Sequence, residues 1–164
     1  MNELLNKLSS YNIFNYLLPG AVFSVVAERL SLLASPEELV TRLIWYYFVG
    51  MVISRVGSVV VEPALKWAHF VTYSDYGKYL LACDKDRKLD VMVEVSNTYR
   101  TLATVFLSII ACIVYKSRFA KSGVSDVWQE RIAIVLLLAL FLLSFRKQVS
   151  FIRRRVDRAV EDEK

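Results

Sequence analysis

The chain has 164 residues, which is enough for one compact domain or one small bundle of membrane helices. Hydrophobic residues make up 55% of it and the mean hydropathy is +0.39, whereas soluble domains are roughly 45–50% apolar. The apolar excess is concentrated in four segments, which favours a membrane protein over a soluble domain. The net charge is +5, with basic residues at the ends of these segments and at the C-terminus, and the two cysteines do not suggest a disulfide framework.

The first two apolar segments predict a helical hairpin. One runs from about Ile13 to Leu33, and the next from Leu39 to about Val61. In the turn between them, Ser35 suits an N-cap and Pro36 suits the first helical position. Residues equidistant from this turn should be neighbours. This places Glu28 near Arg42 and predicts an ion pair close to one membrane interface.

Arg55 is a guanidinium inside the second apolar segment. Trp45 and Trp67 bracket that segment like aromatic belts, and a helix from one to the other rises about 33 Å, close to the roughly 30 Å of a bilayer's hydrocarbon core. A charge at that depth is costly, so it usually faces a partner or a water-filled cavity.

Two interpretations of Arg55 stay open. Pro19 removes a helix hydrogen bond and frees the carbonyl of Asn15. That carbonyl, with the amide of Asn15 or Asn12, would hold Arg55 close to Tyr16 as an intramembrane polar anchor. In the other interpretation the Arg55 side chain extends to the cytoplasmic interface and has no special role.

Small residues recur at a spacing of four in the second segment. Gly50, Ser54 and Ser58 form one face, which Glu62 continues. Faces of this kind let membrane helices approach closely. This helix-packing face predicts packing within the chain, self-association, or a polar lining around an oligomer axis.

Residues 63–100 are mixed and charged, and we expect a helical cytoplasmic connection there. Pro63 is expected to end the preceding helix. Ser74 and Asp75 are suitable for the start of another helix. Its apolar face would carry Tyr76, Tyr79, Leu80 and Cys83.

A second hairpin is predicted over residues 101–147. Thr101–Tyr115 and Ile132–Phe145 are free of charged residues, and Lys or Arg flanks each of them. Both are short, about 21–22 Å if helical, so the flanking side chains must extend to the interface or the bilayer must thin.

Residues 148–164 are expected to continue the last span as a cytoplasmic helix with a narrow Val/Ile stripe, which suggests a helical partner. Acidic residues near the end argue against direct binding of nucleic acid. The basic residues of this region form a predicted surface for anionic lipid or a protein partner. They are Arg146, Lys147, Arg153, Arg154, Arg155 and Arg158.

The Lys and Arg residues near the spans favour both termini and the middle segment in the cytoplasm. The sequence therefore predicts an all-α, polytopic protein of the bacterial inner membrane with four transmembrane helices. Its parts would be a first transmembrane hairpin (1–62), a cytoplasmic helical connection (63–100), a second transmembrane hairpin (101–147) and a cytoplasmic C-terminal helix (148–164).

Enzyme signatures are missing from the sequence. His69 is the only histidine, which excludes a multi-histidine metal site within one chain. Asp84, Asp86 and Asp90 lack the central glycine of a calcium loop. We expect no catalytic residue, no cofactor and no bound metal.

The stretch Tyr11–Phe23 resembles the start of small bacterial membrane proteins found in antiphage defence loci. The four-span layout with a cytoplasmic loop and tail resembles the membrane subunit of the Kiwa defence system. The resemblance implies a homo-oligomeric inner-membrane protein that senses disturbance of the envelope and recruits a cytoplasmic effector. The alternative is a pore-forming effector that depolarises the membrane, with Arg55 or the helix-packing face lining a conduit.

Overall fold

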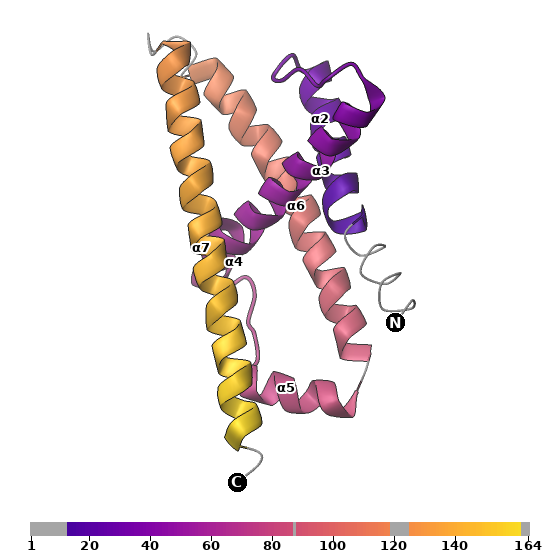
Figure 1. Ribbon diagram of the computed structural model, residues 1–164, viewed down its shortest axis with the longest axis vertical. Coiled ribbons are helices and arrows are strands. Elements are labelled where there is room, and N and C mark those ends of the chain that lie inside the picture. The colour runs from indigo at the N-terminus through magenta and orange to yellow at the C-terminus, as the bar shows by residue number, and fades with distance from the viewer. Residues whose placement is uncertain (1–12, 87, 119–124, 162–164) are drawn as a thin grey trace.

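The computed structural model of the protein describes residues 13–86, 88–118 and 125–161 (Figure 1). Every regular element within these ranges is a helix, as the sequence predicted. In chain order the elements are η1 (Ile13–Leu17), α2 (Leu18–Arg29), α3 (Leu39–Val56), η2 (Gly57–Val61), α4 (Glu62–Trp67), α5 (Tyr76–Lys85), α6 (Lys88–Arg118) and α7 (Asp126–Glu161).

Three helical stretches are long and apolar enough to cross a membrane: Leu39–Trp67, Lys88–Arg118 and Val127–Asp157. They have 29, 31 and 31 residues, so each exceeds the roughly 30 Å hydrocarbon core at about 1.5 Å per residue. The first predicted span is shorter in the structure. Its π-helical turn η1 has 5 residues and α2 has 12, and helix α2 ends at Arg29.

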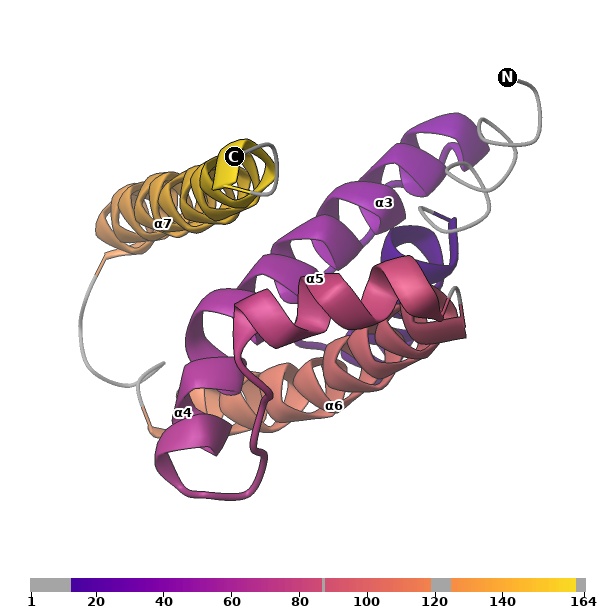
Figure 2. The same ribbon diagram turned by 90° about the horizontal axis from the view of Figure 1, so that it is seen from below.

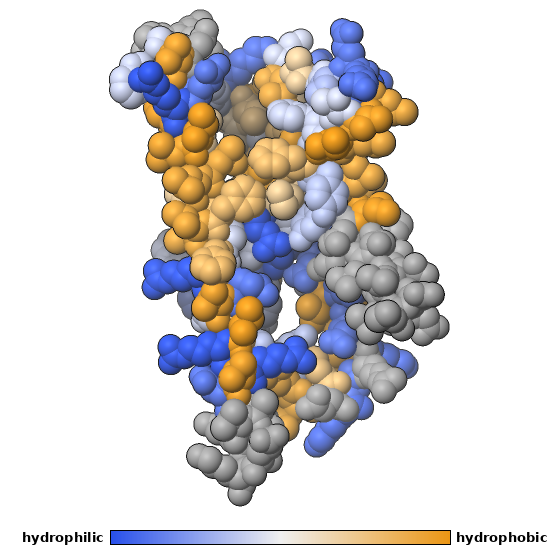
Figure 3. Space-filling view, in the orientation of Figure 1, coloured by the Kyte–Doolittle hydropathy of each residue, from blue (hydrophilic) through white to orange (hydrophobic). Residues whose placement is uncertain are grey.

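The molecule has two distinct ends. The connection between α2 and α3, residues 30–38, lies at one end, where α6 also finishes and α7 begins (Figure 1). We call this the hairpin end. The opposite end, which we call the polar end, consists of α5, residues 88–99 of α6 and residues 148–161 of α7. In Figure 3 apolar side chains predominate over the half with the hairpin end, and hydrophilic side chains are prominent over the other half.

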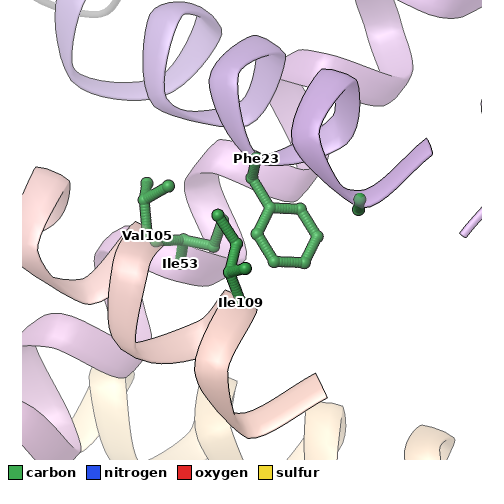
Figure 4. Packing of buried hydrophobic residues seen from close by; sticks show 5 residues of the cluster. Phe23, Ile53, Val105 and Ile109 are labelled. Carbon is green, nitrogen blue, oxygen red and sulfur yellow. The ribbon is translucent and has the colours of Figure 1, made fainter. Parts of the chain in front are cut away.

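The apolar core joins three helices. Phe23 and Ala27 come from α2, Ile53 from α3, and Val105 and Ile109 from α6 (Figure 4). Helix α7 contributes no residue to this cluster and stands to one side of the bundle (Figure 2). None of its most apolar window is buried. Such a surface is suited to contact with lipid or with another chain.

Two glycines bring the first hairpin into backbone contact. A Cβ atom on Gly20 would collide with the carbonyl oxygen of Tyr46, and one on Gly50 would collide with the carbonyl oxygen of Tyr16. Because any side chain would separate the helices, glycine is required at both crossing points. Gly50 belongs to the helix-packing face predicted from the sequence, whereas its counterpart Gly20 does not.

Each π-helical turn ends two residues before a proline: η1 before Pro19 and η2 before Pro63. A proline ring collides with the carbonyl four residues earlier, and a wider π turn relieves that collision. The helix therefore continues through Pro63 to Trp67. The prediction that Pro63 ends the helix is wrong for this reason, and the expected boundary at residue 62 lies inside a helical stretch.

Two capping predictions have opposite outcomes. Asp75 caps α5, because its Oδ1 accepts hydrogen bonds from the backbone N–H groups of Gly77 and Lys78, as expected. Ser35 does not cap α3, which begins only at Leu39. The backbone N–H of Ser35 instead donates to the Glu28 carboxylate at 2.9 Å and helps to close the hairpin connection.

Candidate functional site: a carboxylate that joins three helices

Within the described ranges, Glu62 is the only charged residue that takes part in three ion pairs. It is the first residue of α4 and only 7% of its surface is exposed. Its Oε1 accepts a hydrogen bond from Lys66 Nζ at 2.9 Å, while its Oε2 accepts from Arg100 Nη1 at 2.8 Å and from Lys147 Nζ at 3.2 Å. One carboxylate thereby joins α4, α6 and α7. We call these four residues the Glu62 cluster.

The positions of the cations follow from the sequence pattern. Arg100 directly precedes the uncharged run of α6, and Lys147 follows closely after the uncharged run of α7. Lys66 is one helical turn after Glu62. The apolar parts of three helices therefore end at one level, and the Glu62 cluster marks that level. A charge at such a position is stable only when it is paired and hydrogen-bonded.

Lys147 makes two further hydrogen bonds, both with Ser58. Its Nζ donates to the carbonyl oxygen of Ser58 at 2.7 Å and to the hydroxyl oxygen at 2.9 Å. In η2 the backbone N–H of Glu62 donates to Gly57, five residues back. The next donor in that register would be Pro63, which has no N–H, so the Ser58 carbonyl is available to Lys147.

Gly57 lets α6 approach this region. A Cβ atom at Gly57 would lie 2.7 Å from Thr104 Oγ1 and 3.7 Å from Arg100 Nε. Thr104 in turn donates its hydroxyl to the carbonyl oxygen of Arg100 at 2.8 Å. The small residue therefore keeps Arg100 within reach of Glu62.

The geometry of the Glu62 cluster suits a structural joint. Both carboxylate oxygens are occupied by cations, so Glu62 has little capacity to act as a general base. No group of three or more His, Cys, Asp or Glu residues within the described ranges is arranged to hold a metal ion. The cluster can fix the helices relative to one another, and its three cations exceed its one anion.

Arg55 is half-buried about 10 Å from Glu62 along the helix axis. Its Nη2 donates to the hydroxyl of Tyr16 at 2.8 Å. The predicted contact with the Asn15 amide is not the one formed, because Asn15 faces α6 and its Oδ1 accepts a hydrogen bond from Thr98 Oγ1 at 3.2 Å. Pro19 is fully buried beside them. The other predicted partner, Asn12, lies outside the described residues.

Glu28 and Arg42 do not form the predicted ion pair: it is not among the ion pairs of the described ranges. Glu28 accepts from the backbone N–H of Ser35. The Nε atom of Arg42 donates to the carbonyl oxygen of Pro36 at 2.7 Å. Both side chains satisfy backbone groups of the connection, which competes with direct pairing. Lys116 adds a hydrogen bond from α6 to the Ser31 carbonyl, at 3.0 Å.

The helix-packing face is used within the chain. Gly50 touches the η1 backbone and Ser54 is buried. Ser58 and Glu62 both accept hydrogen bonds from Lys147. This arrangement agrees with packing inside one chain, the first of the three interpretations of the face.

The predicted basic surface divides into two sets. Lys147 and Arg154 face their own chain, and the Arg154 guanidinium lies over the rings of Tyr76 and Phe151, at 5.3 and 5.2 Å from their centroids. Those two rings are 5.5 Å apart and connect α5 to α7. The outward-facing set is Arg146, Arg153 and Arg155. Helix α7 includes Arg158, but the structure does not describe its side chain.

Lys66 and Arg100 are site residues that the sequence analysis did not select. Arg100 could have been found from its position at the boundary of an apolar run, and Lys66 from its spacing of four after a buried acid. Comparison of the chain with protein-family models, curated proteins and solved structures gave no match.

Proposed function

We propose that this chain is a non-enzymatic scaffold or sensor of the bacterial inner membrane that holds a cytoplasmic effector protein at the membrane. The observation that carries the proposal is the fixed platform at the polar end. Beyond the Glu62 cluster, α6 continues for about 18 Å and α7 for about 21 Å. Helix α5 connects the two through Tyr76 and Phe151.

The platform is suited to transmitting a change in the membrane. Because the Glu62 cluster ties α4, α6 and α7 at one level, a change in the tilt of one helix would move the others. The platform would move with them. This coupling supports a sensing role, in which disturbance of the envelope alters the surface that an effector contacts.

The proposed topology has four spans, with the polar end and both termini in the cytoplasm. The concentration of Lys and Arg in the polar end supports this orientation. The fourth span would be the first predicted apolar segment, Ile13–Leu33, of which η1 and α2 form residues 13–29. The unburied apolar window of α7 supports association with further copies of the chain as well as contact with lipid.

A role in antiphage defence is part of the proposal, and its support is the resemblance of Tyr11–Phe23 and of the span layout to the membrane subunit of the Kiwa system. The pore-forming alternative needs Arg55 or the helix-packing face to line a conduit. Arg55 is bonded to Tyr16, and Ser58 and Glu62 hold Lys147. These contacts favour the scaffold.

Two measurements on the purified chain in liposomes test the proposal. The first is potassium efflux, for which the scaffold predicts the rate of empty liposomes and the pore predicts efflux that rises with protein content. The second is co-flotation of the product of an adjacent gene with the proteoliposomes. Efflux without co-flotation would overturn the scaffold in favour of the pore.

A further inference from the structure

Within the polar end, α7 has two faces of different character. The face with Lys147, Phe151 and Arg154 contacts the rest of the chain. The opposite face carries Val149, Ile152 and Val156, which we call the α7 stripe. These three side chains are 45%, 54% and 55% exposed. At 100° per residue, the α7 stripe is centred roughly 170° from Lys147 around the helix.

Lipid does not account for the exposure of the outer part of the α7 stripe. Lys147 marks the level of the Glu62 cluster, where the apolar runs end. Val149, Ile152 and Val156 lie about 3, 8 and 14 Å beyond it along the axis, whereas the headgroup layer adds only about 5–8 Å on each side of the hydrocarbon core. Ile152 therefore lies at the edge of that layer and Val156 lies outside it. In Figure 3 apolar side chains continue along α7 into the polar half, between charged ones. An apolar row in water marks a protein contact.

The spacing of the α7 stripe matches a helical partner. Its members are three and then four residues apart, as in the a and d positions of a coiled coil. A partner helix binds such a row by packing its own apolar side chains along it. The stripe rises about 10 Å, or two helical turns.

The charged side chains beside the α7 stripe determine which charges a partner helix should carry. Arg146 and Arg153 flank it on one side and Arg155 on the other, and all three are exposed. Arg153 pairs with Asp157 at 3.6 Å, with the Arg153 side chain still 81% exposed. A second copy of α7 would bring arginines against arginines, which is unfavourable. Acidic residues on the incoming helix would complement them.

We propose that the α7 stripe binds an amphipathic helix of a partner protein, with apolar side chains at alternating spacings of three and four and Asp or Glu on both flanks. This inference rests on the proposed scaffold function and names the class of its partner. Val149, Ile152 and Val156 would form the apolar contact with the partner helix. Arg153 and Arg155 would favour a partner helix with acidic side chains.

The test uses the full chain in lipid nanodiscs and two labelled synthetic helices with identical apolar positions. One carries Glu at the flanking positions and the other carries Lys. The Glu helix should bind at least about 10-fold more tightly than the Lys helix at low salt, and the difference should shrink near 1 M salt, where the screening length is about 3 Å. The variant Val149→Ser/Ile152→Ser/Val156→Ser should lose binding of both helices.

A charge reversal provides the matched variant. Arg153→Glu/Arg155→Glu leaves the α7 stripe intact, so it should bind the Lys helix in preference to the Glu helix. Equal binding of both helices, or a preference that the reversal does not change, would overturn the proposal. So would a wild-type oligomer that dissociates in the triple-serine variant, since the stripe would then join copies of this chain.

These results are separable from failure of the scaffold function. If the adjacent-gene product still floats with triple-serine proteoliposomes, the scaffold stands and the assignment of its partner to the α7 stripe falls. If potassium efflux rises with protein content and no product floats, the scaffold itself falls. An unchanged melting temperature for both variants shows that the exposed substitutions leave the fold intact.

Discussion

The side-chain amine of Lys147 lies 2.7 Å from the backbone carbonyl oxygen of Ser58, a group that Pro63 cannot satisfy. A proline in one helix thus creates the acceptor for a lysine on another, and the same lysine reaches Glu62. This relationship holds α7 against the bundle, since α7 adds no residue to the apolar core.

The carboxylate of Glu62 should be the main polar determinant of stability. Glu62→Gln keeps the size of the side chain but leaves three cations close together without an anion. We expect a loss of about 2–4 kcal/mol in the free energy of unfolding, because removing one partner of a buried ion pair leaves the other charge unpaired. Denaturant titration in detergent micelles measures it.

Lys66→Gln is the control for that change. Lys66 is paired with the same carboxylate but its side chain is 45% exposed, so the loss should stay below about 1 kcal/mol. Equal losses for the two variants would show that the cluster acts only through surface charge.

Pro63 and Lys147 should be energetically coupled. Pro63→Ala supplies a backbone N–H that competes for the Ser58 carbonyl, so Lys147→Gln should destabilise the Pro63→Ala protein less than it destabilises the wild type. A double-mutant cycle of unfolding free energies should give a coupling of about 0.5–1.5 kcal/mol. Additive effects would contradict the contact described here.

Arg55 should depend on the hydroxyl of Tyr16. Tyr16→Phe removes that oxygen and retains the ring, which packs edge-on against Tyr47 at 5.5 Å. We expect Tyr16→Phe and Arg55→Gln to couple by about 1.5–3 kcal/mol in a cycle, because a hydrogen bond to a charged group contributes about that much. Asn15→Ala, which removes a contact with α6, should show no such coupling to Arg55→Gln.

Gly50→Ala should destabilise the protein. In an ordinary helix interior this change stabilises by about 0.5–1 kcal/mol. Here the added methyl group meets the Tyr16 carbonyl oxygen, so the sign should reverse, with a loss of about 1–3 kcal/mol from overpacking. A rise in the melting temperature would contradict the backbone contact between η1 and α3.

The helices themselves were predictable because apolar runs and capping residues are local signals. The continuation of α7 past Phe145 and the cap at Asp75 were confirmed. The N-cap predicted at Ser35 was wrong, because α3 begins only at Leu39 and the Ser35 backbone bonds a side chain seven residues away. Pro63 was wrongly expected to end a helix. The helix continues because the π turn η2 makes room for the proline ring.

The candidate site was less predictable, because ion pairs depend on which helices become neighbours. Glu62 was selected as a packing residue and Lys147 as a surface residue, and only the fold brings them within 3.2 Å. Glu28 and Arg42 showed the opposite outcome. Their equal distance in sequence from the turn predicted an ion pair. In the structure each side chain instead forms a hydrogen bond with a backbone group of the α2–α3 connection.

Glu62 should fix α6 and α7 into one platform at the polar end, because it pairs with a cation on each of them. The distance between α6 and α7 can be measured in nanodiscs by double electron–electron resonance. The spin labels replace Met92 on α6 and Arg155 on α7, and serine replaces Cys83 and Cys112. We expect one narrow distance distribution for the parent and for Lys66→Gln, and a broad one for Glu62→Gln. A distribution that stays equally narrow in Glu62→Gln would show that Glu62 does not fix the two helices.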